Sequence, residues 1–114
     1  MADADTDALS SEDAKLLTLA RAARAYAGTK EGAAVRDDIG RTYAAASVGL
    51  PSLQLTALQA AVAAAVSSGV SRLDAALIHT NATALTPADE AVVQDLSPTT
   101  VLLASADGAV TVVR

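Results

Sequence analysis

His79 carries the one imidazole of this 114-residue chain, so it is the first side chain to consider for chemistry. A histidine beside a carboxylate can act as a general base or bind a metal, and Asp74, Asp89 and Glu90 are the candidate partners. The chain contains no cysteine and therefore offers no thiolate nucleophile and no thiolate ligand for a metal. Because a metal site needs several ligands, we expect a hydrogen-bonded strand histidine and no bound metal or cofactor.

Serines, aspartates and arginines supply the other candidates. They are Ser67, Ser68 and Ser71; Asp37, Asp38 and Asp107; and Arg21, Arg24, Arg36 and Arg41. The serines lack the glycine-flanked motif of a nucleophile elbow, and the aspartates lack the alternating acidic pattern of a calcium loop. We therefore interpret the serines as helix-end residues, the aspartates as turn residues, and the arginines as members of ordinary ion pairs.

Charge is distributed unevenly along the chain, whose net charge is -5. Five of the 13 acidic residues lie within the first 13 positions, which leaves eight acidic and eight basic residues in the body. A neutral body has no basic stripe for nucleic acid or for an anionic membrane. The acidic start also lacks the positive region of a signal peptide, so we expect a cytoplasmic protein. Residues 1–10 are predicted to be a flexible acidic tail, and residues 11–114 a single domain.

The first ordered elements are predicted to be a helix and a hairpin. Ser10 or Ser11 can cap a helix that ends at Gly28, with apolar residues at helical spacing between them. Residues 33–37 and 41–47 have the composition of two strands, joined by a turn that contains two aspartates and a glycine. We expect these two strands to pair antiparallel.

Residues 42–71 contain no charged side chain. Gly49 and Pro51 interrupt this stretch, and its apolar core is too short to cross a bilayer. We predict instead a soluble helix over residues 53–66, in which Leu53 and Val66 are the first and last bulky residues. A helix without charges needs apolar cover on more than one face, so we expect it to mediate self-association into a dimer or tetramer.

The C-terminal part is predicted to form a strand, a helix and a hairpin. The strand spans residues 72–80, the helix begins with a Thr86 cap followed by Pro87 and stops before Pro98, and the hairpin joins residues 100–104 to 109–113. The short connection makes these last two strands antiparallel. The complete order predicts an α/β fold, a five-stranded mixed sheet with helices on both faces.

Several local strings and this order of elements resemble the zinc-dependent cytidine deaminase family. The strings are residues 22–27 (AARAYA), 32–35 (GAAV), 38–43 (DIGRTY), 55–62 (LTALQAAV) and 86–91 (TPADEA). The resemblance runs from about residue 16 to the C-terminus. It implies the three-layer cytidine deaminase fold.

The departures from the family pattern fall on the residues that would perform the chemistry. Thr56 stands where the family has its first zinc ligand, and Leu58 stands in place of the glutamate that moves protons. If Pro87 anchors the later motif, Ala88 and Ala91 occupy its two cysteine positions. An alignment on the apolar residues of the later helix shifts that register by about two residues, and neither register supplies a cysteine.

These departures favour a protein that keeps the fold without the reaction. Deamination requires a zinc-bound water whose pKa is lowered to roughly 7 and a glutamate that relays protons. We therefore predict a catalytically inactive, zinc-free, homo-oligomeric structural or interaction module whose vestigial site positions are Thr56, Leu58, Pro87, Ala88 and Ala91. Two alternatives are a pseudoenzyme that binds a nucleoside or another small molecule, and a hydrolase or deaminase that uses His79 with Asp89 or Glu90.

Overall fold

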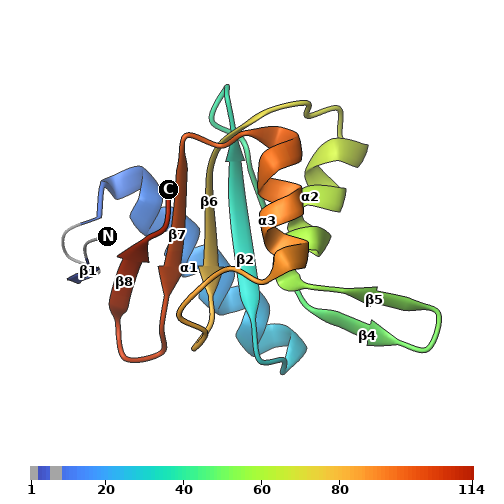
Figure 1. Cartoon of the computed structure of the whole chain (residues 1–114), viewed down its shortest axis with the longest axis horizontal. Helices are drawn as coiled ribbons and strands as arrows, with labels where there is room; N and C mark the ends of the chain where they lie inside the picture. Colours follow the sequence, from blue (N-terminus) through green and yellow to red (C-terminus); the bar gives the residue numbers. More distant parts are fainter. Residues whose placement is uncertain (1–2, 6–8) are drawn as a thin grey trace.

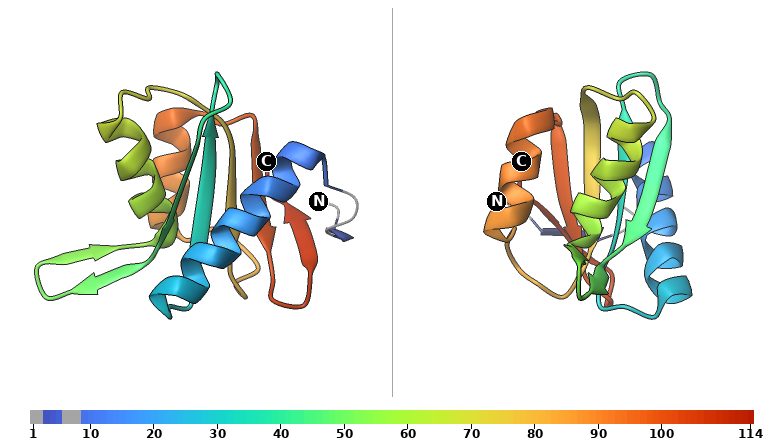
Figure 2. Two further views of the ribbon diagram at one scale, coloured as in Figure 1. Left: turned by 180° about the vertical axis from the view of Figure 1, so that it is seen from behind. Right: turned by 90° about the vertical axis from the view of Figure 1, so that its right-hand side faces the viewer.

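The computed structural model describes residues 3–5 and 9–114, which form a six-stranded sheet between two helical layers (Figures 1 and 2). The strands of this sheet are β1 (Asp3–Asp5), β2 (Gly32–Asp37), β3 (Thr42–Ala46), β6 (Leu73–His79), β7 (Thr100–Ala104) and β8 (Ala109–Val112). Their order across the sheet is β1-β8-β7-β6-β2-β3. The pair β6–β7 is parallel and all other neighbours are antiparallel, including the last pair, β7–β8. The predicted α/β fold and the five predicted strands of its mixed sheet, β2, β3, β6, β7 and β8, are therefore confirmed, and β1 is an additional strand.

Helix α1 (Ser11–Ala27) covers one face of the sheet. The Ser10 hydroxyl accepts a hydrogen bond from the backbone N–H of Asp13, and Gly28 ends the helix with a positive φ of 69°. Leu16, Leu17 and Ala20 are buried against the apolar side chains of the sheet. Both predicted ends of this helix are thus the observed ones.

Helices α2 (Ala57–Ser67) and α3 (Pro87–Leu96) cover the opposite face, as Figure 2 shows. Leu58, Ala61 and Ala65 of α2 join Val93 and Leu96 of α3 in one buried cluster with the sheet. Helix α3 connects the parallel strands β6 and β7. The starts of α2 and α3 lie near the same end of the sheet (Figure 1). None of the described helices is long and apolar enough to cross a membrane.

The uncharged stretch folds differently from the prediction of one helix over residues 53–66. Strands β4 (Val48–Leu50) and β5 (Leu53–Leu55) pair antiparallel into a separate hairpin, and α2 begins only after Thr56. Pro51 and Ser52 form the two-residue turn of this hairpin. The helix start is fixed by a capping box in which Thr56 and Gln59 bond to each other's backbone N–H.

The acidic start also differs from the expected flexible tail over residues 1–10. Asp3–Asp5 pairs antiparallel with β8, where Ala4 lies opposite Val110, and so adds a sixth strand at the edge of the sheet. Backbone pairing with an open sheet edge needs no particular side chain, which is why an acidic segment can supply it. Residues 1–2 and 6–8, the rest of the predicted tail before Leu9, lie outside the described residues.

Candidate functional site

The candidate site lies where the N-termini of α2 and α3 meet. Thr56 caps α2 and Thr86 caps α3, and each hydroxyl accepts a hydrogen bond from the backbone N–H three residues later. The donors are the N–H groups of Gln59, at 3.0 Å, and of Asp89, at 3.2 Å. Thr-x-x-Gln and Thr-x-x-Asp are ordinary capping sequences, so local chemistry places two hydroxyls at the same end of the sheet.

Asp89 connects the two helix starts. Its side chain is only 2% exposed, and its Oδ1 atom accepts a hydrogen bond of 2.6 Å from the Thr56 hydroxyl. Burial raises the pKa of Asp89, and the negative charge of Glu31 adds to this, whereas the hydrogen bonds from Thr56 and Thr86 oppose it. The site therefore contains one buried carboxyl group that is held between two threonines.

The predicted site residues are placed differently from one another. Thr56 lies in the site, and Leu58 is 1% exposed within the apolar core beneath it. Pro87 opens α3 but is exposed, as are Ala88 and Ala91. The residue of α3 that hydrogen-bonds to Thr56 is Asp89.

Helix geometry explains why Asp89, and not Ala88 or Ala91, faces Thr56. The capping residue and the third residue of a helix lie on the same side of its first turn, so Thr86 and Asp89 lie together while Ala88 and Ala91 are exposed. Thr86 and Asp89 stand two positions before Ala88 and Ala91. This difference has the size of the shift that an alignment on the apolar residues of the later helix gives. The sequence identifies Thr86 as a cap, but it contains no signal that Asp89 is turned toward α2.

Zinc, which the resemblance implies, does not fit these residues. Two threonine hydroxyls and one carboxylate are not a zinc donor set, and the Oδ1 atom of Asp89 is already bonded to Thr56. The apolar side chain of Leu58 can neither coordinate a metal nor carry a proton. Within residues 3–5 and 9–114, no three His, Cys, Asp or Glu side chains come together as a potential metal site.

His79 is the hydrogen-bonded strand histidine that was expected, and its partner is an arginine of α1. It is 7% exposed at the end of β6, and its Nδ1 atom lies 3.2 Å from an Nη atom of Arg24. Since a guanidinium only donates, Nδ1 is the acceptor and the ring proton of the neutral imidazole is on Nε2. Burial lowers the pKa of His79, and the positive charges of Arg24 and Arg21 lower it further.

Two of the three carboxylates that were candidate partners of His79 accept hydrogen bonds from other side chains, and the third is exposed on α3. Asp74 accepts hydrogen bonds of 3.0 and 2.9 Å from Arg36, and Asp89 accepts the bond from Thr56. Glu90 is an exposed residue of α3. The contacts of the described residues therefore provide no acid–base pair at His79, and the pairing with Asp89 or Glu90 that the alternative hypothesis requires is not formed.

Two of the candidate serines and Asp107 take the structural roles expected of them, whereas Arg24 contacts His79 and forms no ion pair among the described residues. Ser67 and Ser68 both donate to the carbonyl of Ala64 at the end of α2. Asp107 accepts hydrogen bonds from Ser105 and from the backbone of Ala109 in the last turn.

Asp37 holds the β2–β3 turn together. Its carboxylate accepts a hydrogen bond of 2.7 Å from Nε of Arg41 and two more from the backbone N–H groups of Ile39 and Arg41. Burial alone would raise the pKa of Asp37, but these hydrogen bonds lower it. Arg36 forms ion pairs with Asp13 and Asp74, and Arg41 forms one with Asp37, so these two arginines have the expected role.

Two adjoining pockets, for which the sequence carries no signal, lie nearby, and Thr56 lines the smaller of them. The larger has a volume of about 560 Å³ and includes Arg24, Lys30 and Asn81 in its lining. The smaller has a volume of about 360 Å³ and includes Thr56 and Gln59. They share Glu31 and Ser47. These residues come from five different segments, and no local sequence pattern signals that the segments meet.

Comparisons with known proteins agree with the resemblance. A family model described as cytidine deaminase-like matches residues 9–108. A crystal structure of cytidine deaminase from Burkholderia pseudomallei is 25% identical, with a TM-score of 0.76, covering 87% of this chain and 89% of that one. Cytidine deaminase from Mycobacterium leprae is 22% identical, with a TM-score of 0.63, covering 87% and 91%. No curated protein matches the chain.

Proposed function

The chain belongs to the cytidine deaminase-like family, and from this premise we propose that it retains the family fold as a self-associating module that does not deaminate cytidine. The observation that carries the loss of catalysis is the hydrogen bond between Thr56 and Asp89. Deamination of cytosine needs an activated water and a residue that transfers protons to and from the ring. A carboxyl group that is hydrogen-bonded to a threonine, with the apolar Leu58 in place of the glutamate, does not supply zinc ligation for that water.

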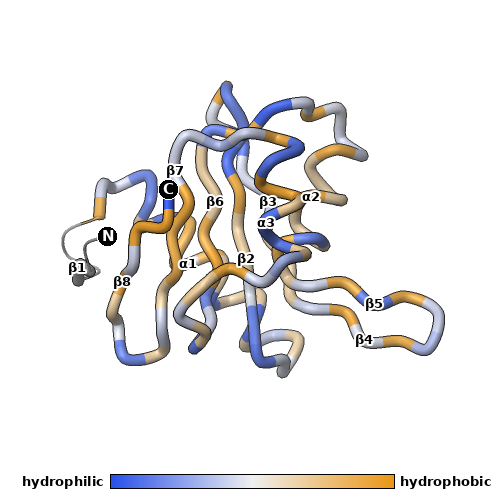
Figure 3. Tube along the Cα trace, in the orientation of Figure 1, coloured by the Kyte–Doolittle hydropathy of each residue, from blue (hydrophilic) through white to orange (hydrophobic). Residues whose placement is uncertain are grey.

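Self-association is supported by the surface of the uncharged stretch. The exposed side of α2 presents Ala63, Ala64 and Val66, and the neighbouring β4–β5 hairpin presents Leu50 and Leu53. Figure 1 shows this hairpin projecting from the body, and Figure 3 shows that apolar residues follow it and α2. Five exposed apolar side chains on adjoining elements form a surface that a monomer would leave in water.

A second copy of this chain is the partner that this surface fits best. Residues 42–71 contain no charge, so a partner with charged groups would have to bury them here without ion pairs. A second copy brings an equally uncharged face, and the alanines of α2 let two such helices approach closely. We therefore propose a homodimer or a larger homo-oligomer formed through α2 and the hairpin.

Light scattering coupled to size exclusion tests the association. We expect the wild type to elute as an oligomer at micromolar concentration and Ala64→Lys to shift it toward the monomer, because the lysine places a charge in the contact. Ala91→Lys is the matched control, an exposed alanine of α3, and it should leave the mass unchanged. A monomeric wild type, or equal effects of the two lysines, would contradict the proposal.

Metal content and ammonia release test the absence of deamination. The purified protein should contain no stoichiometric zinc, and it should release no ammonia from cytidine above the rate without protein. Zinc bound one to one, or measurable turnover of cytidine, would overturn this part of the proposal and leave the oligomer to be judged separately.

Binding of a small molecule without turnover is a second candidate function. The two adjoining pockets favour it, since Thr56 lines the smaller one and polar side chains from several elements line both. The larger pocket is compatible with self-association, because its lining residues Arg24, Lys30 and Asn81 lie outside α2 and the hairpin, whereas residues of the hairpin and of α2 line the smaller pocket.

A further inference from the structure

The larger pocket has a cationic and polar lining that neither the fold nor the proposed self-association requires. Arg24 comes from the last turn of α1 and Lys30 from the loop after it. Ser47 lies between β3 and β4, and Asn81 follows β6. These segments are far apart in the chain, yet they surround one volume of about 560 Å³.

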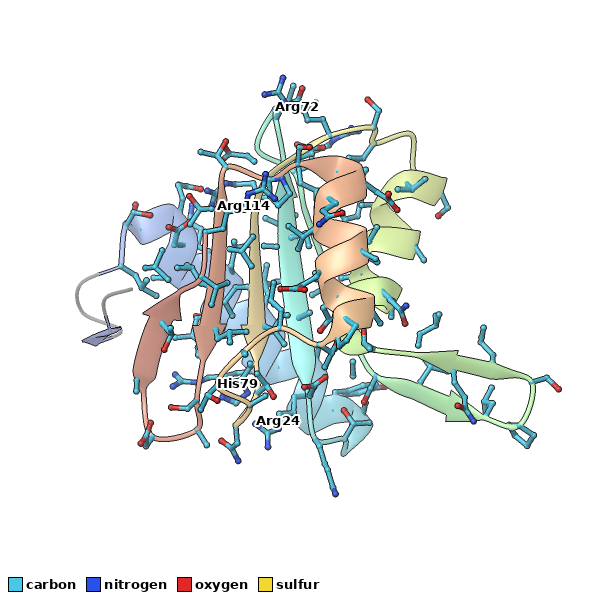
Figure 4. The ribbon with its side chains drawn as sticks, viewed as in Figure 1. Arg24, Arg72, His79 and Arg114 are labelled. Carbon is cyan, nitrogen blue, oxygen red and sulfur yellow. The ribbon has the colours of Figure 1, made fainter. Side chains whose placement is uncertain are left out.

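Arg24 keeps its positive charge available to this pocket. Its hydrogen-bond partner is the imidazole of His79, and no ion pair of Arg24 with a carboxylate is formed within residues 3–5 and 9–114. His79 accepts through Nδ1 and is neutral, so it orients the guanidinium without cancelling its charge. Figure 4 shows the two side chains together at one end of the sheet.

Glu31 is the one carboxylate among the described residues that line this pocket. Its Oε2 atom accepts a hydrogen bond of 2.8 Å from the buried hydroxyl of Thr80, which holds the side chain in place. Arg24 and Lys30 contribute two positive charges against this single negative one. The pocket therefore carries a net positive charge, although the whole chain is acidic.

The smaller pocket continues from the larger one past Glu31 and Ser47. Its other polar lining consists of uncharged groups, the amides of Gln54 and Gln59 and the hydroxyl of Thr56. A ligand that spans both pockets would place an anionic group near Arg24 and Lys30 and an uncharged polar group near the amides.

We propose that the pocket between Arg24 and Lys30 is a binding site for a phosphate monoester carried by a small polar molecule. Two cationic side chains from different segments, with hydroxyl and amide donors beside them, match a tetrahedral dianion that accepts hydrogen bonds in several directions. His79 acts as a positioning residue for Arg24. The inference rests on the ligand-binding candidate and is independent of self-association.

Calorimetric titration of the full-length chain tests this site with three probes, inorganic phosphate, cytidine and cytidine 5′-monophosphate, at one ionic strength. Both phosphate-containing probes should bind, and cytidine 5′-monophosphate should bind at least about tenfold more tightly than cytidine. Arg24→Gln should weaken phosphate binding about tenfold or more, and Lys30→Gln should weaken it several-fold.

Arg72→Gln is the matched control, because Arg72 is an exposed arginine that precedes β6, whereas His79 and Arg24 lie at the other end of that strand (Figure 4). It removes the same charge and should leave phosphate binding unchanged. An equal loss in Arg24→Gln and Arg72→Gln would overturn the site, since it would show only a diffuse effect of net charge.

The probes separate the possible failures. If cytidine binds as tightly as its monophosphate and inorganic phosphate does not bind, the phosphate site is wrong while the ligand-binding candidate stands. If none of the three probes binds at millimolar concentration, the phosphate site is overturned and the ligand-binding candidate loses its support. Light scattering of the same samples reports on self-association separately.

Discussion

At the scale of single residues, the chain keeps the family fold but forms a hydrogen bond between side chains at the position where the resemblance implies metal ligands. Thr56 and Asp89 form a direct hydrogen bond between the starts of α2 and α3, where the resemblance implies a metal. A hydrogen bond between two side chains of the same chain forms whenever the chain folds, so this contact joins the helices without an external ligand. The pair should therefore matter for stability.

Replacing Thr56 by valine should lower the free energy of unfolding by about 1–3 kcal/mol, because it removes a cap and leaves the buried carboxyl of Asp89 without its donor. Urea denaturation at pH 7 measures this. Thr56→Ser retains the hydroxyl and should lose much less, and the exposed Thr83→Val should change stability by less than about 0.5 kcal/mol. A Thr56→Val protein as stable as the wild type would refute a structural role of this contact.

His79 should make stability depend on pH. Its folded pKa lies below the unfolded value near 6.5, so between those two values the unfolded chain binds more protons. Its contribution to stability is complete above pH 6.5, declines as the pH falls toward the folded pKa, and levels off below it. Asp89 has the opposite sign, since its raised pKa lets the folded state take up a proton first.

Urea denaturation at pH 7.5 and pH 5.5, with His79→Gln beside the wild type, separates these two groups. The glutamine keeps an acceptor for Arg24 but does not titrate. The wild type should lose more stability than His79→Gln over this interval, and the difference belongs to the imidazole because Asp89 is common to both. Identical pH profiles would show that His79 titrates alike in the folded and unfolded chain.

At the scale of elements, α1 lies so close to β2 that one position admits only glycine. A Cβ atom on Gly32 would lie 2.1 Å from the carbonyl oxygen of Ala20 and 2.9 Å from Cβ of Arg24. Gly32→Ala should therefore lower the free energy of unfolding by about 1–3 kcal/mol or more, measured by urea denaturation. The displaced end of α1 should also weaken phosphate binding at Arg24.

Gly49→Ala is the matched control for this close approach. Gly49 lies in β4, has open space around the position of a Cβ atom, and does not have a positive φ. The added methyl group should be neutral there or stabilise by up to about 1 kcal/mol through the unfolded state. If both substitutions had the same effect, the loss at Gly32 would come from the backbone preference of glycine and not from the contact with α1.

The elements predicted correctly from the sequence are those with local signals. The Ser10 and Thr86 caps, Gly28 and the turn at Asp37 each act within a few residues, and so they reveal α1, α3 and the β2–β3 hairpin. The predicted start of the helix in the uncharged stretch was wrong, because the leucines there are equally compatible with a strand and with a helix. Only the observed capping box of Thr56 and Gln59 separates β5 from α2.

The candidate site was less predictable because its residues meet only in three dimensions. Arg24, Lys30 and Asn81 line one pocket although more than fifty residues separate the first from the last. Thr56 was singled out only because the family resemblance placed a ligand there, whereas its partner Asp89 was missed. A buried aspartate in the first turn of a helix has the same sequence signature as an exposed one.

At the scale of the whole molecule, the neutral body and the uncharged surface of α2 and β4–β5 lead to a prediction about heat stability. An oligomer that forms only from folded chains shifts the unfolding equilibrium, so the thermal midpoint should rise by about 2–5 °C for each tenfold increase in concentration. Differential scanning fluorimetry over two decades of concentration measures this. Ala64→Lys should flatten the dependence, whereas Ala91→Lys should keep it. A wild-type midpoint that does not change with concentration would show that the uncharged surface stays in water.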